Sequence, residues 1–479
     1  MIKNKVLSSS FWTLGVGVVD RFAAFIIYIV LARYLGVEEF GVVAFSILFI
    51  EFIFLVINSV VNEFIVSKDS INSTFINTCF YSVMLSAFVL IFLFYFSIDL
   101  LFYDKNSLTI DVLKALAFLP FISSFNIIQV ALLQREFSFK SISLRSLLST
   151  LLAGFVGVIM AINGFGAWAL VFNKYIKVII DTVFMLYITK FIPALEFSVE
   201  DFKNAYRFGI PLLLSEVMNF WSSRTMELFV STFYGLAAFA ILDVGRKFSK
   251  MINQVSLTPL RSVCLSYVSR SEDKGLSFLK FSAIVTIIVA PALIFIGFFA
   301  EPIIYSTLGS KWESAIVVCQ ILSFAALPQC LSWYFSVPLI ALNKTRSVFK
   351  VNLMVFIVSI LFSGVAYFVS FEHFIITQTV LLCLASVFKL YYLLSTNVFS
   401  FNKAFTELCP VITVAVSSLV ACFFARYYTE SFFSNDFSVS NILLLIFISI
   451  IVTFLNLFFV FVFHRKLFFE LMSIKQLMS

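Results

Sequence analysis

The sequence Leu35-Gly36-Val37-Glu38-Glu39-Phe40-Gly41 joins the first two long apolar segments of this chain. A similar sequence, Tyr234-Gly235-Leu236-Ala237-Ala238-Phe239-Ala240, joins the seventh and eighth apolar segments. Ala117-Phe118-Leu119-Pro120 is similarly matched by Ala325-Ala326-Leu327-Pro328, at nearly the same separation along the chain. Internal similarity of this kind is typical of transporters that contain two structural repeats. Because an even number of apolar segments separates the members of each pair, the repeats are predicted to be parallel rather than inverted.

The composition of the chain fits a bilayer rather than water. Of its 479 residues, 61% are hydrophobic and 12% are charged, and the mean hydropathy is +1.05. A soluble domain is about 45–50% apolar and about 25% charged. Because so few charged side chains are present to cover a water-exposed surface, the whole chain is predicted to be an all-α, polytopic membrane protein.

About fourteen segments reach the roughly 20 mostly apolar residues that a helix needs to cross a bilayer. They lie near residues 10–33, 39–65, 74–98, 108–133, 143–164, 166–189, 206–233, 236–260, 277–299, 315–340, 350–370, 374–396, 405–427 and 438–463. Together with the internal repeat, these segments predict two six-helix bundles and two additional helices. The predicted domains are residues 1–203, 204–400 and 401–479.

The charges of the connecting loops predict the orientation of the chain. With the N-terminus in the cytoplasm, about 21 Lys and Arg residues fall on the cytoplasmic side and about 4 on the other, an excess that marks the cytoplasmic face. Both termini are therefore predicted to be cytoplasmic. The first apolar run, from Phe11 to Leu31, contains Asp20-Arg21 and lacks a small-residue cleavage pattern, so it is predicted to be a retained span rather than a signal peptide.

Four short sequences give the chain a resemblance to a known family. They are Ala32-Arg33-Tyr34-Leu35-Gly36-Val37-Glu38-Glu39-Phe40-Gly41, Phe208-Gly209-Ile210-Pro211, Phe233-Tyr234-Gly235 and Leu308-Gly309-Ser310-Lys311-Trp312. With the twelve-plus-two arrangement of spans, they resemble the polysaccharide transporter family, which includes the Wzx-type flippases and the colanic-acid exporters. The resemblance covers essentially the whole chain, but it does not distinguish one substrate from another.

The resemblance implies a multidrug/oligosaccharidyl-lipid/polysaccharide exporter fold, which is MATE-like, with two bundles around a central cavity that opens alternately to each side. The implied cargo is an O-antigen or exopolysaccharide repeat unit on undecaprenyl pyrophosphate, carried from the cytoplasmic to the periplasmic leaflet of the bacterial inner membrane. The implied partners are this lipid-linked oligosaccharide, membrane lipids, and a polysaccharide polymerase with its chain-length machinery; no nucleic acid is expected. The family supplies no catalytic motif to transfer residue by residue.

Charged side chains are concentrated in the predicted span at 236–260. Its polar residues recur at the spacing of one helical face; they are Asp243, Arg246, Lys247, Lys250, Asn253 and Gln254. Ionisable groups inside a span are costly unless they face water, a partner or a substrate. Two interpretations remain open: the face lines the transport cavity, or it lies near the cytoplasmic end of the span, where Lys and Arg extend to the interface.

Three acids, Asp20, Glu51 and Glu216, lie deep within predicted spans. Carboxyl groups inside spans commonly form proton or ion pathways, so these three are the predicted ion-coupling residues. Glu51 and Lys250 lie at the same distance from the matched glycines of the two repeats, so an acid in one half corresponds to a base in the other. A structural ion pair and a state-dependent gate both remain open.

The other charges within the predicted spans are mostly basic, which favours an anionic cargo. Arg binds phosphate through a planar fork and Lys binds it as a point charge, whereas acids and aromatic side chains would line a cavity for cationic drugs. The predicted cargo-binding residues are Arg21, Lys174, Lys177, Arg224, Arg246, Lys247 and Lys250. Lys174 and Lys177 share one face of the span at 166–189 with Asn173 and Asp181.

Two other functions remain open. A multidrug or small-molecule antiporter of the same superfamily is the nearest alternative, and a polysaccharide polymerase or ligase is less favoured because every predicted external loop is short. The chain has no GxxxxGK[ST] loop for ATP, and its seven cysteines show no metal-binding spacing. We therefore predict a transporter rather than an enzyme, with no cofactor and no metal.

Overall fold

The computed structural model describes residues 2–59, 61–68, 71–136, 138–342, 344–429, 433 and 439–463. Within these residues the chain is helical and contains no strand, which confirms the prediction of an all-α fold. The predicted cytoplasmic C-terminus, beyond residue 463, lies outside the described residues.

The chain forms two compact units. The first consists of Met1–Ser231 and Gly235–Ala240, and the second of Thr232–Tyr234 and Ile241–Ser479. The chain therefore passes from one unit to the other three times within about ten residues. The predicted division at residues 203 and 400 stays a prediction.

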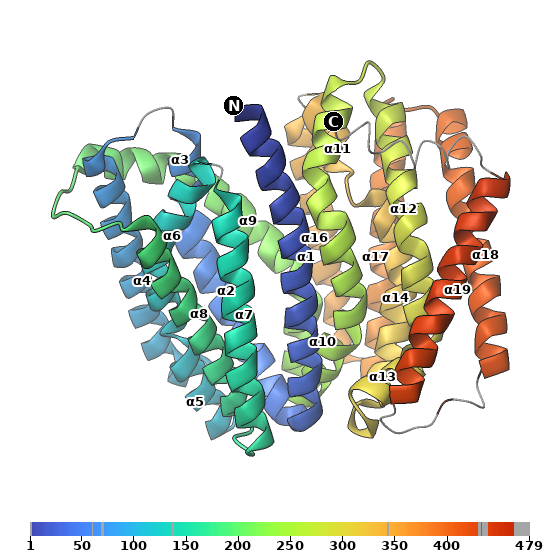
Figure 1. The fold of residues 1–479 in the computed structure, drawn as a ribbon, viewed down its shortest axis with the longest axis horizontal. Coiled ribbons are helices and arrows are strands. Elements are labelled where there is room, and N and C mark those ends of the chain that lie inside the picture. The colour runs from blue at the N-terminus through green and yellow to red at the C-terminus, as the bar shows by residue number, and fades with distance from the viewer. Residues whose placement is uncertain are drawn as a thin grey trace. The chain divides into compact units, whose positions relative to one another are not determined.

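The helices of the first unit run from the N-terminus to the start of α10. They are α1 (Ile2–Tyr34), α2 (Val37–Ser59), α3 (Asn62–Ser67), α4 (Ser73–Leu101), α5 (Ser107–Leu116), α6 (Leu119–Arg135), α7 (Phe139–Ile162), α8 (Ala167–Thr189) and α9 (Val199–Phe233). Helix α7 packs against both α1 and α8, and α6 packs against both α4 and α8 (Figure 1).

The second unit contains most of α10 and the helices that follow it. They are α10 (Gly235–Ile252), the π-helix η1 (Asn253–Leu257), α11 (Thr258–Arg270), α12 (Lys274–Phe298), α13 (Ala300–Thr307), η2 (Ser310–Trp312), α14 (Ala315–Ser332), α15 (Ser336–Ala341), α16 (Thr345–Ser363), η3 (Gly364–Tyr367), α17 (Phe371–Ser395), α18 (Phe401–Thr429) and α19 (Val439–Phe463). Helix α12 packs against α14 and α18, and α19, drawn in red in Figure 1, packs along α18.

The chain is a multi-pass membrane protein. In the described part of the chain, 10 helical segments are long and apolar enough to cross a bilayer. The predicted spans at 166–189, 206–233, 236–260 and 438–463 correspond to α8, α9, α10 with α11, and α19, which are not among those 10 segments. The count of fourteen is therefore not confirmed. Helices α8, α9 and α10 also carry most of the predicted site residues.

Short polar side chains begin three of the membrane helices. Asn72 accepts a hydrogen bond from Phe75 N at 2.8 Å at the start of α4, and Asn106 accepts one from Thr109 N at 3.0 Å at the start of α5. Asp273 does the same for Leu276 N at 2.9 Å at the start of α12. Each side chain satisfies a backbone N–H that has no partner within its own helix. These positions therefore set where the apolar segments begin.

The two predicted spans that contain the matched sequences Ala117–Pro120 and Ala325–Pro328 are both interrupted. The span at 108–133 is α5 followed by α6, with Pro120 in the first turn of α6, where a proline is well tolerated. The span at 315–340 is α14 followed by α15, with Pro328 inside α14. The matched segments are therefore both broken helices, but their prolines occupy different positions relative to the break.

The loop sequence at 35–41 is explained by two close contacts. The Glu39 carboxylate accepts a hydrogen bond from Gly36 N at 3.0 Å, which closes the first turn of α2. Gly41 faces the backbone of Leu236 so closely that a Cβ at Gly41 would lie 2.1 Å from the Leu236 carbonyl oxygen. The Phe45 and Phe239 rings meet edge to face at 6.2 Å. The first matched sequence thus packs against residues 235–240 of the second, within the first unit.

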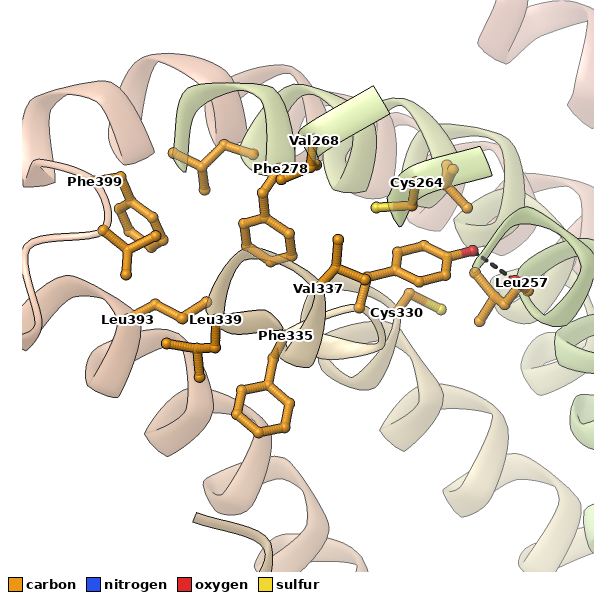
Figure 2. Packing of buried hydrophobic residues seen from close by; sticks show 14 of the residues in the cluster. Leu257, Cys264, Val268, Phe278, Cys330, Phe335, Val337, Leu339, Leu393 and Phe399 are labelled. Carbon is orange, nitrogen blue, oxygen red and sulfur yellow. Dashed lines mark hydrogen bonds between the residues drawn. The ribbon is translucent and has the colours of Figure 1, made fainter. Parts of the chain in front are cut away.

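A buried hydrophobic cluster holds η1, α11, α12, α15 and α17 together in the second unit (Figure 2). Tyr334 is fully buried in it, and its hydroxyl donates a hydrogen bond to the Leu257 carbonyl oxygen at 2.7 Å, drawn as a dashed line in Figure 2. Leu257 ends the π-helix, where the regular i→i−4 pairing of the backbone changes. The tyrosine thus provides a partner for a carbonyl at this irregular point.

We expect Tyr334→Phe to destabilise the second unit without changing its packing volume. The Leu257 carbonyl would remain buried without its hydroxyl donor, at a cost of about 1–3 kcal/mol. Thermal unfolding of the purified protein would measure this loss, and Tyr391→Phe, at an exposed position on α17, serves as the control. Equal melting temperatures for both variants would contradict the stabilising role of this hydrogen bond.

Candidate functional site

The first unit contains a charged cluster where α1, α7 and α8 meet, which we call the α7 cluster. Ser146 donates a hydrogen bond to Asp20 Oδ2 at 2.7 Å, and Ser149 donates one to Asp181 Oδ1 at 2.7 Å. Arg145 Nε lies 3.2 Å from Asp181 Oδ1, but not in hydrogen-bonding direction, and both side chains are largely buried. Two carboxylates and one guanidinium thus lie together on these helices, with Asp20 half-buried.

The α7 cluster has unused hydrogen-bonding capacity. Among the described residues, none reaches the buried atoms Asp20 Oδ1 and Arg145 Nη1 with a hydrogen bond. Buried polar atoms are nearly always paired with protein or water. Asp20 and Lys177 both lie within electrostatic range of the Asp181 carboxylate. Asp20 Oδ1 can therefore still accept a proton or a hydrogen bond, and Arg145 Nη1 can still donate to a water molecule. This is the chemistry expected of an ion-coupling site.

The polar face of α8 is oriented mainly towards α7. Asn173 donates to the Ala153 carbonyl oxygen at 2.8 Å, and Asp181, eight residues later on the same face, is bonded to Ser149 of α7. Lys174 and Lys177 are half-buried on the same helix. This face, predicted to suit an anionic cargo, therefore holds two helices together through Asn173 and Asp181. A cargo-binding role for Lys174 and Lys177 stays a prediction.

A second charged cluster joins α2 to α9, and we call it the Arg224 cluster. Arg224 Nη2 donates to Glu51 Oε2 at 2.6 Å. Arg224 Nη1 donates to both carboxylate oxygens of Glu227, at 3.0 and 2.8 Å. The side chains of Glu51, Arg224 and Glu227 are 46%, 19% and 3% exposed. One guanidinium therefore bridges an exposed and a buried carboxylate.

Aromatic side chains surround the Arg224 cluster. Phe52, which follows Glu51 in α2, has its ring 5.6 Å from that of Phe220 and 5.0 Å from that of Trp221. The Arg224 guanidinium carbon lies 5.7 Å from the centre of the Phe220 ring, within cation–π range. Aromatic contacts thus join α2 to α9 beside the ion pairs.

The second unit carries the polar face of α10. Asp243, Arg246, Lys247 and Lys250 are half-buried along this helix. The helix ends at Ile252, and Asn253 and Gln254 lie in the π-helix, where the period changes from i+4 to i+5. Of the six residues predicted to share one face, the four up to Lys250 lie in the regular α-helix. Asn253 and Gln254 do not.

Of the remaining predicted residues, Arg21 is half-buried on α1 beside Asp20, and Glu216 is exposed on α9. The structure adds two residues that sequence reasoning did not select, Arg145 and Glu227. Glu227 stands three residues after Arg224, a spacing that places them on one helical face and predicts their ion pair. Arg145 has no such local signal, because its partner Asp181 lies on another helix. No group of three or more potential metal ligands occurs among the described residues.

Comparison with known proteins places the chain in a family. A family model described as polysaccharide biosynthesis protein matches residues 30–317, more than half of the chain. The succinoglycan biosynthesis transport protein ExoT of Rhizobium meliloti (strain 1021) is 23% identical over 199 residues, which are 41% of this chain and 40% of that protein. The match thus spans less than half the length of this relative.

Solved structures share the fold along most of the chain. The lipid II flippase MurJ, in an inward closed conformation, matches with a TM-score of 0.74 at 16% identity, over 94% of this chain and 98% of that one. An inward-facing multidrug resistance MATE family transporter of the MOP superfamily matches with a TM-score of 0.58 at 14% identity, over 78% of this chain and 97% of that one. The expected MATE-like fold is confirmed, and so is the resemblance carried by the loop sequences: the chain belongs to the polysaccharide biosynthesis protein family.

Proposed function

We propose that this protein flips an oligosaccharide linked to undecaprenyl pyrophosphate from the cytoplasmic to the periplasmic leaflet of the inner membrane by alternating access. The observation that carries the proposal is Arg224, a guanidinium on α9 whose Nη2 donates to the exposed Glu51 carboxylate, 2.6 Å away. A guanidinium fork matches a phosphate, and each charge-assisted contact contributes about 1.5–3 kcal/mol. The names of two similar proteins, a succinoglycan biosynthesis transport protein and a lipid II flippase, support this substrate class.

Further basic side chains are proposed as cargo-binding residues, each described within its own unit. Arg246, Lys247 and Lys250 lie half-buried on α10, and Arg21 lies half-buried on α1. Each adds a positive charge that favours the pyrophosphate over a neutral lipid. We propose Lys174 and Lys177 of α8 as further contributors. A cytoplasmic position of both termini, and cooperation with a polysaccharide polymerase and its chain-length machinery, belong to the same proposal.

The decisive test is the side of the membrane on which lipid-linked repeat units collect. In cells that lack this protein but retain the glycosyltransferases, we expect the repeat units to accumulate on the cytoplasmic leaflet and surface polysaccharide to be lost. Expression of the intact chain should reverse both effects. Normal amounts of periplasmic repeat units in the deletion strain would contradict the proposal.

A multidrug antiporter is the second candidate, because a MATE transporter shares the fold. The Arg224 cluster and the basic face of α10 favour an anionic cargo instead. Drug susceptibility of the deletion strain distinguishes the two functions when surface polysaccharide is measured beside it. Loss of an antiporter would raise susceptibility with the polysaccharide intact, whereas loss of a flippase would remove the polysaccharide. A polymerase or ligase is not favoured, because the similar proteins are named as transport proteins and flippases.

We further propose that the α7 cluster couples transport to protons through Asp20, in preference to Glu51, which binds Arg224, and to Glu216, which is exposed. Asp20→Asn should abolish proton-dependent flux in membrane vesicles without loss of folded protein, because the amide cannot exchange a proton. Asp111→Asn, at an exposed position on α5, is the control. Full proton dependence in Asp20→Asn vesicles would place coupling elsewhere or show that the carrier is uncoupled.

A further inference from the structure

The two carboxylates that bind Arg224 lie in different surroundings. Glu227 is 2% exposed and lies one turn from Arg224 on the same helix. Glu51 lies on α2, and its side chain is 46% exposed. Removing one partner from a buried ion pair is strongly destabilising, whereas an exposed ion pair contributes little. The bond to Glu227 is therefore the permanent one, and the bond to Glu51 is readily exchanged.

The guanidinium divides its donors between these partners. Nη1 is occupied by both oxygens of Glu227, at 3.0 and 2.8 Å, and this fixes the plane of the group. Nη2 points to Glu51 Oε2 at 2.6 Å. A phosphate oxygen that approached from the exposed side would bind this same edge. Glu51 thus holds the position that an anionic ligand of Arg224 would take.

We propose that Glu227 is a positioning residue that orients Arg224, and that Glu51 is a displaceable internal anion that competes with the cargo pyrophosphate for Nη2. This inference rests on the proposed function. It assigns opposite effects on cargo affinity to two glutamates that bind the same arginine. It also couples binding to movement, because a phosphate that displaces Glu51 breaks the ion pair between α2 and α9.

The contacts around the cluster are suited to such an exchange. Besides the ion pair, Phe52 of α2 meets Phe220 and Trp221 of α9 through tilted rings at 5.6 and 5.0 Å, an apolar contact that tolerates sliding. Pro211 lies inside α9, where it removes a backbone hydrogen bond and permits bending. The part of α9 beyond Pro211 can thus shift relative to α2 once the bond to Glu51 is released.

The test measures binding of a short-chain prenyl pyrophosphate to the purified full-length protein in nanodiscs. Glu51→Gln removes the competing charge at constant size and should tighten binding about fivefold. Glu227→Gln removes the positioning charge and should weaken binding about tenfold. Glu200→Gln, at an exposed position in the first turn of α9, should leave the affinity unchanged. Melting temperatures of all variants show that each is folded.

The outcomes separate this inference from the proposed function. Weaker binding by both Glu51→Gln and Glu227→Gln would overturn the inference, because Glu51 would then assist the cargo. Arg224→Lys keeps the charge of Arg224 but loses its fork. If Arg224→Lys weakens binding while Glu51→Gln leaves the affinity unchanged, the inference is overturned as well. If Arg224→Lys and the neutral double variant Arg224→Gln with Glu227→Gln both bind as the native protein does, Arg224 takes no part and the cargo site proposed here also fails.

Discussion

Replacement of Arg224 by Ala is expected to abolish transport and to destabilise the first unit. Glu227, 2% exposed, would keep its charge inside the protein without the guanidinium that now binds both of its oxygens. Loss of one partner from a buried ion pair costs about 3–5 kcal/mol. The measurement combines the melting temperature of the purified variant with the amount of lipid-linked repeat units on the cytoplasmic leaflet.

A double variant separates the two effects of this change. Arg224→Gln combined with Glu227→Gln leaves no buried unpaired charge, because the remaining Glu51 side chain is 46% exposed. Its melting temperature should therefore return most of the way to the native value. Its transport should remain lost, because no guanidinium is present to bind the pyrophosphate. A double variant that restores transport together with stability would show that Arg224 has only a structural role.

Gly41→Ala is expected to prevent correct assembly of the first unit. The added Cβ would lie 2.1 Å from the Leu236 carbonyl oxygen, and a backbone atom cannot rotate away as a flexible side chain can. Helix α2 would have to move away from residues 235–240, with a cost above the roughly 1–3 kcal/mol of ordinary overpacking. Protein yield in the membrane and the melting temperature of any folded material measure this effect.

Gly36→Ala is the matched control in the same loop. A Cβ there would meet only the Glu39 side chain, at an ordinary contact distance of 3.4 Å. We expect near-native yield and stability for this variant. Equal losses in both variants would show that the loop requires glycine for a reason other than the close approach to Leu236.

The fold was predictable because a segment that crosses a bilayer must be long and apolar, and its backbone N–H and C=O groups must be hydrogen-bonded within the helix. The two matched loop sequences also indicated a repeat, and the structure shows them in contact through Gly41 and Leu236. The sequence did not predict that contact, because similarity between two segments says nothing about whether they touch. The π-helix at Asn253–Leu257 was likewise not predicted, since no residue type specifies the change of period there.

The sequence indicated which charged residues matter, but it did not indicate which of them form pairs. Asp20, Glu51 and Arg224 stand out because charges in membrane spans are costly. Equal spacing from the matched glycines associated Glu51 with Lys250, and this correspondence stays a prediction. The pair of Glu51 with Arg224, at 2.6 Å, had no signal in that spacing. Pairing across helices depends on helix rotation and tilt, which packing determines. Arg224 and Glu227, one turn apart on α9, form a pair that spacing alone indicates.

The alternation of the chain between its two units has a consequence for split-protein complementation. Tyr234 donates hydrogen bonds to the Ala366 and Val369 carbonyl oxygens in the second unit, whereas Leu236, two residues later, packs against Gly41 in the first. A cut before Gly235 would deprive the N-terminal fragment of the backbone that Gly41 faces, and a cut after Ala240 would deprive the C-terminal fragment of Tyr234. Two co-expressed halves divided anywhere in this region must therefore exchange a segment before either is complete, and neither half is a self-sufficient folding module.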